Sequence, residues 1–246
     1  MLAYVLHLAD NALVAGHRNS EWTGHGPILE QDIALSNIAL DLVGQARNLY
    51  QYAATIANDG STEDSFAYLR DAREYKNCLL VEQPNGDWAQ TITRQYFFSA
   101  FQQLYYAALK GSADKTLASI ADKSLKEVHY HNKWSAEWII RLGDGTEESH
   151  RRMNLAVNKL YQYTGELFEA AHYESELVKE NIAVDLRTIK EDYYENINKV
   201  ISTASLPLPG NTFMQTGGKT GLHTEHLGYL LAEMQFLQRA YPNANW

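Results

Sequence analysis

The sequence predicts an all-α protein, a bundle of long helices with additional helices at its flanks. Apolar residues recur at three- and four-residue intervals through most of the 246 residues, which is the spacing of a helix with one buried face. The alternating pattern of half-buried strands is hard to find. Four of the expected helices span roughly 24 to 35 residues, well above the mean of about 11 to 12. Long helices joined by turns are typical of antiparallel bundles.

Turn-forming residues divide the first half of the chain into four expected helices. These helices cover about residues 2–20, 29–57, 64–80 and 88–110. The sequence "GHGP" ends the first helix, and "NDGST" ends the second. Pro84, Asn85 and Gly86 form a turn before the fourth helix, and Asp87 is a suitable N-cap because its carboxylate accepts a backbone N–H.

The second half of the chain contains four further expected helices. Asp114 caps a helix that runs to Leu142, and Thr146 opens a long helix that runs to about residue 180. The last two helices cover about residues 185–203 and 223–240, and the irregular stretches "LPLPG" and "TGGKTG" lie between them. No internal repeat or low-complexity tract divides the chain, so we predict a single domain over residues 1–246.

Composition excludes several classes of protein. The chain has 30 acidic and 21 basic residues, a formal net charge of −9, and no block of Lys and Arg, so we expect no nucleic-acid partner. Cys78 is the only cysteine, which excludes an internal disulfide. His7 and Asp10 interrupt the first apolar run before it resembles a signal sequence, and no apolar stretch approaches the roughly 20 residues of a membrane span. We predict a cytoplasmic protein without a membrane partner.

The predicted 29–57 helix carries a polar stripe. At about 100° per residue, five polar side chains fall within about 40° of Asp41, with leucines and isoleucines on either side. They are Glu30, Asn37, Asp41, Gln45 and Asn48. A polar stripe bordered by apolar residues is not an ordinary solvent face. Two readings remain open: the stripe meets other polar groups or water inside the bundle, or Asp41 is a metal ligand.

The predicted 88–110 helix carries a matching polar row without charge. Its members are Thr91, Gln95, Ser99 and Gln102, at positions i, i+4, i+8 and i+11. None of the four ionises. Gln95 is a poor iron ligand compared with a carboxylate, because it offers one neutral oxygen.

The stretch "KEVHYHNKW" resembles a metal site because Glu127 and His131 share one face of a predicted helix at i, i+4. Lys123 lies one turn before Glu127, so its ammonium group can reach the carboxylate and balance its charge. An ion pair with core packing and a metal site are the two interpretations. We favour the ion pair.

Glu169 and His172 have the i, i+3 spacing of a di-iron ligand pair, and this is the strongest single indication of metal. A carboxylate-bridged di-iron bundle requires a carboxylate from each of two helices and Glu-x-x-His from each of the other two. Asp41 and Glu127 supply further carboxylates, but the fourth helix offers only Gln95 and neutral neighbours. We therefore predict a degenerate seam without paired irons, and a single metal ion remains an alternative.

Other motifs for catalysis are weaker. The stretch "TGGKTG" lacks the spacing of a phosphate-binding loop and a preceding strand, and Cys78 has no recognisable base near it in the sequence. His223 and His226 flank Glu225 at i, i+3 without a third ligand in view. Helix capping and surface contact is the expected role of these residues.

Several stretches together resemble a known family. They are "EWTGHGPILEQDIALSNIALDLVGQARNLYQYAA", "LLVEQPNGDWAQTITRQY", "KEVHYH" and "TGGKTGLHTEHLGYLLAEMQFLQRAYP". In this order they are similar to the C subunits of bacterial phenylacetyl-CoA epoxidases, also called ring 1,2-phenylacetyl-CoA monooxygenases. The resemblance covers nearly the whole chain, and the C-terminal stretch is its most specific part.

The resemblance implies a ferritin-like four-helix bundle within a multicomponent oxygenase of aerobic phenylacetate catabolism. In that family a homologous A subunit holds the di-iron centre and binds the CoA ester, and a reductase supplies electrons from NADPH. The C subunit pairs with the A subunit and is structural, having lost iron ligands. The resemblance thus implies no cofactor in this chain. Glu169 and His172 depart from the expected pattern, which leaves affinity for a single metal ion open.

Three hypotheses for the function follow. The first is a non-catalytic subunit that braces the A subunit, the second is an active or metal-binding di-iron oxygenase, and the third is a metal store or free-standing scaffold. Under the first, the glycine-rich C-terminal segment is either a partner contact or a loop that closes the bundle. The residues of this segment that we single out are Gly217, Gly218, Lys219, Gly221, His223, Glu225 and His226.

Overall fold

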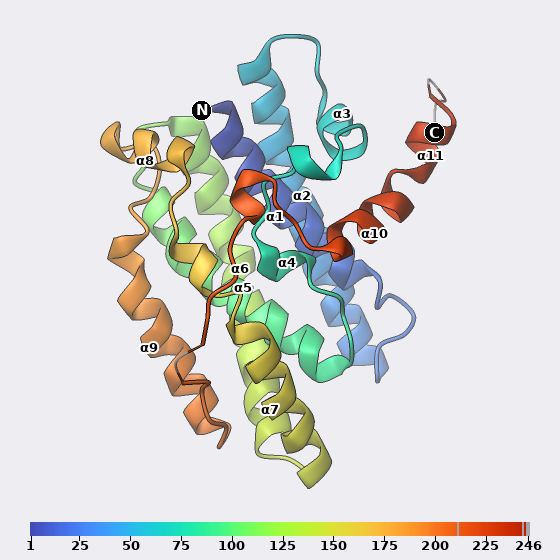
Figure 1. The fold of residues 1–246 in the computed structure, drawn as a ribbon, viewed down its shortest axis with the longest axis vertical. Coiled ribbons are helices and arrows are strands. Elements are labelled where there is room, and N and C mark those ends of the chain that lie inside the picture. The colour runs from blue at the N-terminus through green and yellow to red at the C-terminus, as the bar shows by residue number, and fades with distance from the viewer. Residues whose placement is uncertain (211, 243, 245–246) are drawn as a thin grey trace. The chain divides into compact units, whose positions relative to one another are not determined.

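The structure, a computed structural model, describes residues 1–210, 212–242 and 244. In these residues it contains eleven α-helices, three short 3-10 helices and no β-strand, so the all-α prediction is confirmed (Figure 1). The chain forms two compact units. Unit 1 comprises residues 1–83 with the chain from residue 217 onward, and unit 2 comprises residues 84–216. The expectation of a single domain over 1–246 stays a prediction.

Unit 1 is built on two long helices, α1 (Leu2–Ser20) and α2 (Leu29–Ala57), which match the predicted ranges. The two helices pack along each other, and α1 is buried over most of its length. Gly16 permits this close approach, because a methyl group at this position would lie 3.0 Å from the Cγ2 atom of Val43. Unit 1 also contains α3 (Glu63–Tyr68), α4 (Leu79–Glu82), α10 (Glu225–Met234) and α11 (Phe236–Ala240).

The predicted 64–80 helix is wrong. Thr62 caps α3, but the helix ends at Tyr68, and only a 3-10 turn, η1 (Ala72–Glu74), precedes α4. Side chains of α1 bind the backbone N–H groups that a helix would need. Asp10 accepts from Lys76 N at 2.8 Å, and Asn11 accepts from Cys78 N at 2.8 Å. The stretch between η1 and α4 is therefore held against α1.

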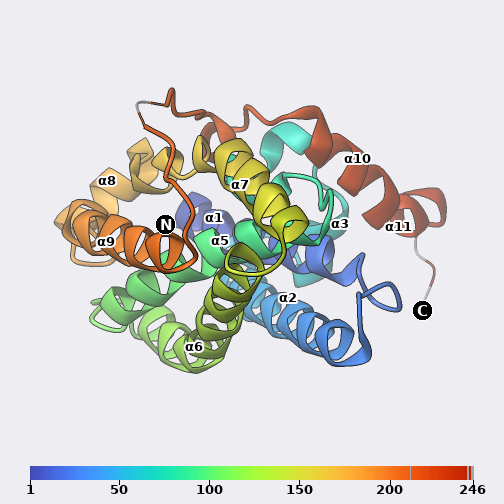
Figure 2. The ribbon, with the colours of Figure 1, turned by 90° about the horizontal axis from the view of Figure 1, so that it is seen from below.

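Unit 2 is organised around α5 (Trp88–Leu109), most of whose residues are buried. The helices α6 (Lys115–Gly143), α7 (Glu147–Tyr161) and α9 (Arg187–Thr203) pack against it, and Figure 2 shows them around α5. The three predicted N-caps are confirmed, because the side chains of Asp87, Asp114 and Thr146 each accept a backbone N–H at the start of α5, α6 and α7.

The predicted long helix from Thr146 to about residue 180 is also wrong. It is divided into α7, the 3-10 helix η2 (Gly165–Phe168) and α8 (His172–Lys179). A distant segment occupies the break: Gln215 N donates to the carbonyl oxygen of Gln162 at 2.8 Å, and a methyl group on Gly165 would lie 2.6 Å from Met214 Cγ. The ring of Phe168 then packs on Phe101 and on the α9 tyrosines.

Candidate functional site

The predicted seam residues are distributed over several elements. Asp41 lies on α2 of unit 1, whereas Gln95 lies on α5 and Lys123, Glu127 and His131 lie on α6 of unit 2. Gln95 and His131 are buried, Asp41 and Glu127 are half-buried, and Lys123 is exposed. Both groups of the expected Lys123 and Glu127 ion pair have access to water, and the ion pair itself stays a prediction.

Glu169 and His172 do not share a helix. Glu169 follows η2 with an extended backbone, and His172 is the first residue of α8. Both are exposed. The i, i+3 spacing puts two side chains on one face only within a continuous helix, so the strongest sequence indication of a di-iron ligand pair is lost. The prediction that this pair belongs to a seam is wrong.

The polar stripe of α2 is in part a solvent face. Gln45 is buried and Asp41 and Asn48 are half-buried, but Glu30 and Asn37 are exposed. The expectation that the whole stripe faces the interior is thus correct only for its second half. Several apolar residues beside the stripe are exposed as well, including Ile33 and Leu40.

A layer of buried polar side chains lies on α5 and α6, and its members on α5 are amides and hydroxyls that do not ionise. On α5 the layer contains Thr91, Gln95, Ser99 and Gln102, all buried, and on α6 it contains His131 and Ser135, also buried. The Ser99 Oγ and Ser135 Oγ atoms lie 3.3 Å apart, and Ser135 Oγ also lies 2.7 Å from the carbonyl oxygen of His131. The contact of Ser99 with Ser135 joins the two helices through their side chains.

The buried phenol of Tyr106 lies beside this layer. Burial raises the pKa of Tyr106, a hydrogen bond with Gln102 lowers it, and the nearby charge of Glu127 raises it. The net effect is a phenol that stays protonated well above its ordinary range.

This donor set does not fit a di-iron centre. Such a centre requires four carboxylates and two imidazoles from four helices, whereas amides and hydroxyls dominate between α5 and α6. Within the described residues, no group of three or more His, Cys, Asp and Glu side chains is placed to hold a metal ion. The absence of paired irons from the protein in solution stays a prediction.

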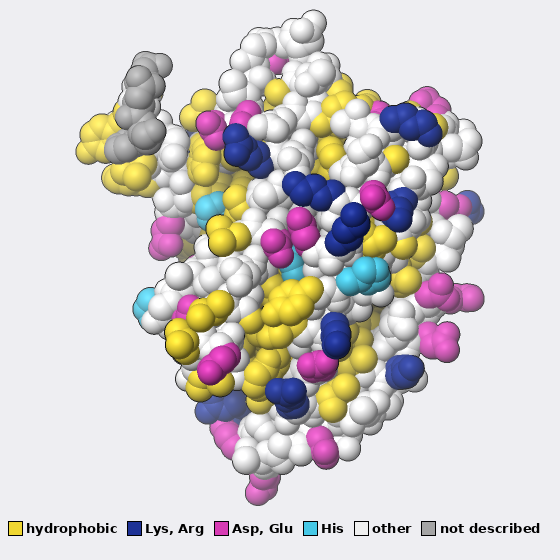
Figure 3. All heavy atoms as spheres, turned by 180° about the vertical axis from the view of Figure 1, so that it is seen from behind, with side chains coloured by type: hydrophobic (Ala, Val, Ile, Leu, Met, Phe, Trp, Pro, Cys, Tyr) yellow, Lys and Arg dark blue, Asp and Glu magenta, His cyan; other side chains and the backbone are white. Residues whose placement is uncertain are grey.

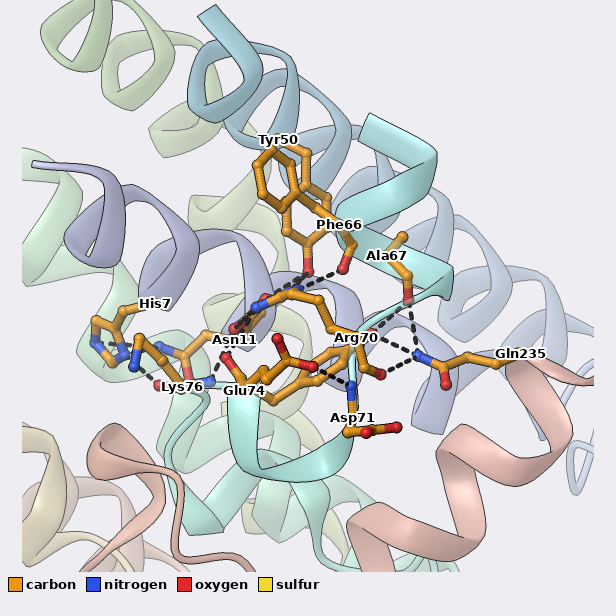
Figure 4. A network of polar contacts seen from close by, with 12 residues as sticks. His7, Asn11, Tyr50, Phe66, Ala67, Arg70, Asp71, Glu74, Lys76 and Gln235 are labelled. Carbon is orange, nitrogen blue, oxygen red and sulfur yellow. Dashed lines mark hydrogen bonds and ion pairs between the residues drawn. The ribbon is translucent and has the colours of Figure 1, made fainter. Parts of the chain in front are cut away.

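A buried ion pair in unit 1 was not expected from the sequence. Arg70 contacts both carboxylate oxygens of Asp10, with Nη1 at 3.1 Å from Oδ2, and Tyr50 donates its hydroxyl to the same carboxylate at 2.5 Å. The guanidinium group lies 4.3 Å from the centre of the Tyr75 ring. Figure 4 shows this network, in which Gln235 of the C-terminal segment also donates to the Arg70 carbonyl oxygen.

The electrostatics of this network keep Arg70 and Tyr50 protonated. Burial by itself lowers the pKa of Arg70, but attraction to Asp10 outweighs burial and raises that pKa above its ordinary value. Burial and then the charge of Asp10 raise the pKa of Tyr50 well above its usual range. The pairing is a structural arrangement, since neither Arg70 nor Tyr50 titrates near neutral pH. Asp10 within an apolar run was the only signal in the sequence.

The glycine-rich C-terminal segment contacts the first 83 residues of unit 1 closely. A methyl group on Gly218 would lie 2.3 Å from the carbonyl oxygen of Asn77, and one on Gly221 would lie 2.3 Å from that of Arg73. Gly218 and Lys219 are buried, whereas Glu225 is exposed. The close approach that these glycines permit is therefore made within the chain. A partner contact through the exposed residues stays a prediction.

Other surface features do not suggest chemistry. A groove of about 520 Å³ along α10 and α11 is lined by apolar residues with Asp71 and Arg239, which pair with each other at 2.9 Å. On the face drawn in Figure 3, basic side chains are dispersed among acidic and apolar ones. In the described part of the chain, no helix combines the length and apolar character needed to cross a bilayer.

Comparisons with known proteins agree with the resemblance seen in the sequence. The model of the family described as phenylacetic acid catabolic protein matches residues 1–246. The chain is 49% identical over 246 residues to the Escherichia coli (strain K12) protein named as the C subunit of 1,2-phenylacetyl-CoA epoxidase, and the match spans all of this chain and 99% of that protein. The resemblance and the ferritin-like all-α fold that it implied are confirmed. The chain belongs to the phenylacetic acid catabolic protein family.

Proposed function

We propose that this chain is a non-catalytic, structural subunit of a cytoplasmic oxygenase complex that epoxidises the aromatic ring of phenylacetyl-CoA. The relative from Escherichia coli is named as a subunit of such an epoxidase. In this proposal the chain pairs with a homologous A subunit, which holds the di-iron centre. A reductase supplies that subunit with electrons from NADPH.

The buried polar row of α5 carries the proposal of a structural role. Helices of a di-iron bundle present carboxylates and imidazoles to their shared interior. Here Gln95, Ser99 and Gln102 of α5 are buried instead, and Ser99 contacts Ser135 of α6. Buried amide and hydroxyl side chains on α5 do not supply the charged ligands that paired irons require, so this arrangement favours a structural role over oxygen chemistry.

The surface of α2 supports the pairing with another subunit. Leu29 is 71% exposed, Ile33 is 51% exposed and Leu40 is 69% exposed. With Val43 they fall within about 80° of one another around the helix and form an apolar row that we call the α2 row. Aligned, exposed apolar side chains of this size are typical of protein interfaces. We assign the α2 row to contact with the A subunit.

Reconstitution tests the role of the chain. The protein is purified alone, the A subunit alone, and the two together after co-expression, and each sample is assayed for iron and for NADPH-dependent consumption of phenylacetyl-CoA with the reductase. We expect little iron and no turnover with this chain alone, and a stable complex that turns over. Two irons per chain with oxygen consumption by the chain alone would instead establish a di-iron oxygenase.

Two arginine substitutions test the assigned surface. We expect Leu40→Arg to weaken co-purification with the A subunit, because it places a charge within an apolar contact. Ser202→Arg, at an exposed position of α9 in unit 2, is the matched control and should pair like the unmodified chain. Undiminished pairing of a folded Leu40→Arg variant would reject the α2 row, whereas the first experiment tests the structural role separately.

A further inference from the structure

The carboxylate of Glu82 is the main anchor of the C-terminal segment in unit 1. Glu82 lies on α4 and is fully buried. It accepts hydrogen bonds from Thr224 N at 2.7 Å, Thr224 Oγ1 at 2.8 Å and Asn77 Nδ2 at 2.8 Å, and His223 Nδ1 lies 2.7 Å from Oε2. Three of these four contacts come from the C-terminal segment, so the burial of one carboxylate depends on a part of the chain some 140 residues away.

The ring of His223 lies between two hydrogen-bond acceptors. Its Nδ1 faces the carboxylate of Glu82, and its Nε2 lies 3.0 Å from the backbone carbonyl oxygen of Tyr75. The side chain is only 4% exposed, so water cannot readily replace either partner. A neutral imidazole has one N–H and can donate to only one of the two, whereas an imidazolium donates to both.

The other possibility places the extra proton on Glu82, and the contacts of the carboxylate argue against it. Oε1 accepts two hydrogen bonds from Thr224, and Oε2 accepts one from Asn77. Hydrogen bonds donated to a carboxylate stabilise its ionised form. We propose that His223 is an imidazolium in the folded protein and that its ion pair with Glu82 is a pH-sensitive latch for the C-terminal segment.

Further charged and titratable groups surround this latch. Arg18 of α1 donates to the Glu82 carbonyl oxygen at 3.1 Å and to the His226 carbonyl oxygen at 2.8 Å. Further groups on the elements nearby are Arg73 and Glu74 of η1, the phenol of Tyr75, the adjacent Lys76, and Lys219, Glu225 and His226 of the segment. Glu82 is the acidic group in direct contact with His223, so its negative charge stabilises the second proton on the His223 ring.

The direction of the pH effect follows from the proton count. In the closed state His223 carries two ring protons. In an opened segment His223 is exposed to solvent and is neutral above about pH 6.5, so the closed state then holds one proton more. Rising pH therefore favours opening, by about tenfold per pH unit, until His223 loses its proton in the closed state as well. The effect is local, because the contacts of Arg18 and of the glycines persist without this proton.

Two measurements on the full chain test the latch. In nitrogen-15 NMR of the histidine rings, with His223→Gln to assign the signal, we expect both ring nitrogens of His223 to be protonated at pH 7.5. In limited proteolysis, cleavage after the buried Lys219 reports opening of the segment. We expect its rate, corrected for cleavage of an unstructured peptide of the same sequence, to rise between pH 6.5 and 8.5.

Variants separate the latch from general destabilisation. The variants His223→Gln and Glu82→Gln should be cleaved faster after Lys219, and their cleavage should no longer depend on pH. His129→Gln changes an exposed histidine of α6 in unit 2, and its cleavage should keep the pH dependence of the unmodified chain. Circular dichroism checks that each variant is folded. A neutral His223 ring at pH 7.5, or cleavage of the unmodified chain that does not depend on pH, would overturn the proposal.

Discussion

Removal of one partner from the buried Asp10 and Arg70 pair is expected to destabilise the protein strongly. Asp10→Ala leaves the Arg70 guanidinium without its counter-charge, and it removes the acceptor for the Tyr50 hydroxyl at 2.5 Å and for Lys76 N at 2.8 Å. Arg70 is buried, so water cannot solvate the charge that remains. Breaking a buried pair in this way costs about 3–5 kcal/mol.

Thermal and urea unfolding followed by circular dichroism measure this loss. For a chain of this size each kcal/mol lowers the Tm by about 2–4 °C, so Asp10→Ala should lower it by about 6–20 °C. The double variant Asp10→Asn with Arg70→Met removes both charges together and keeps an acceptor for Lys76 N. The double variant should lose less free energy of unfolding than the single variants Asp10→Asn and Arg70→Met lose together. The difference, which is the coupling energy, should be about 1–3 kcal/mol.

The exposed pair of Asp185 and Arg187 is the matched control. Its atoms lie 2.7 Å apart, but the Arg187 side chain is almost fully exposed. Arg187→Ala should leave the Tm unchanged within error, because exposed ion pairs contribute little. A loss below about 1 kcal/mol for Asp10→Ala, or two single effects that simply add, would refute the claim that the buried pair is coupled.

Three further predictions follow from the packing. Gly218→Ala should destabilise the protein by about 1–3 kcal/mol in urea unfolding because its methyl group meets a backbone oxygen, whereas Gly44→Ala, with open space around it, should be neutral or stabilising; equal effects would contradict the structure. Lys123→Ala should leave the Tm unchanged, since Lys123 is exposed, and a marked drop would show that this residue has a buried role. Stability should fall above about pH 10, because unfolded tyrosines ionise there while burial raises the pKa of the folded ones; an ultraviolet titration that shows the folded tyrosines ionising at their ordinary pKa would contradict this. These tyrosines are Tyr50, Tyr75, Tyr96 and Tyr106.

The parts of the fold that the sequence predicted are those determined by local contacts. The caps at Asp87, Asp114 and Thr146 bind N–H groups three residues away, and so their effect is visible in a short stretch of sequence. The two wrong helices were broken by distant residues. Asp10 binds the backbone of Lys76, and Gln215 binds that of Gln162. Helical periodicity contains no information about such partners.

The candidate site shows the same division. The neutrality of Gln95 and its neighbours was evident from residue type, and their burial followed from the spacing on one helix face. Glu169 and His172 were misread because their motif has meaning only on a continuous helix, and the break between η2 and α8 depends on packing elsewhere in unit 2. The pairing of Glu82 with His223 was not predicted, because some 140 residues separate them in the sequence.

The order of the chain has a consequence for how the protein is made. Unit 2 is one continuous stretch, whereas unit 1 joins the first 83 residues to a segment that begins at residue 217. During synthesis on the ribosome, Glu82 emerges long before His223 and Thr224, its eventual partners. Until residues 223 and 224 have been synthesised, the Glu82 carboxylate lacks three of the four contacts that it makes in the folded protein. A chain that stops directly before residue 217 would contain all of unit 2 but would lack the C-terminal part of unit 1.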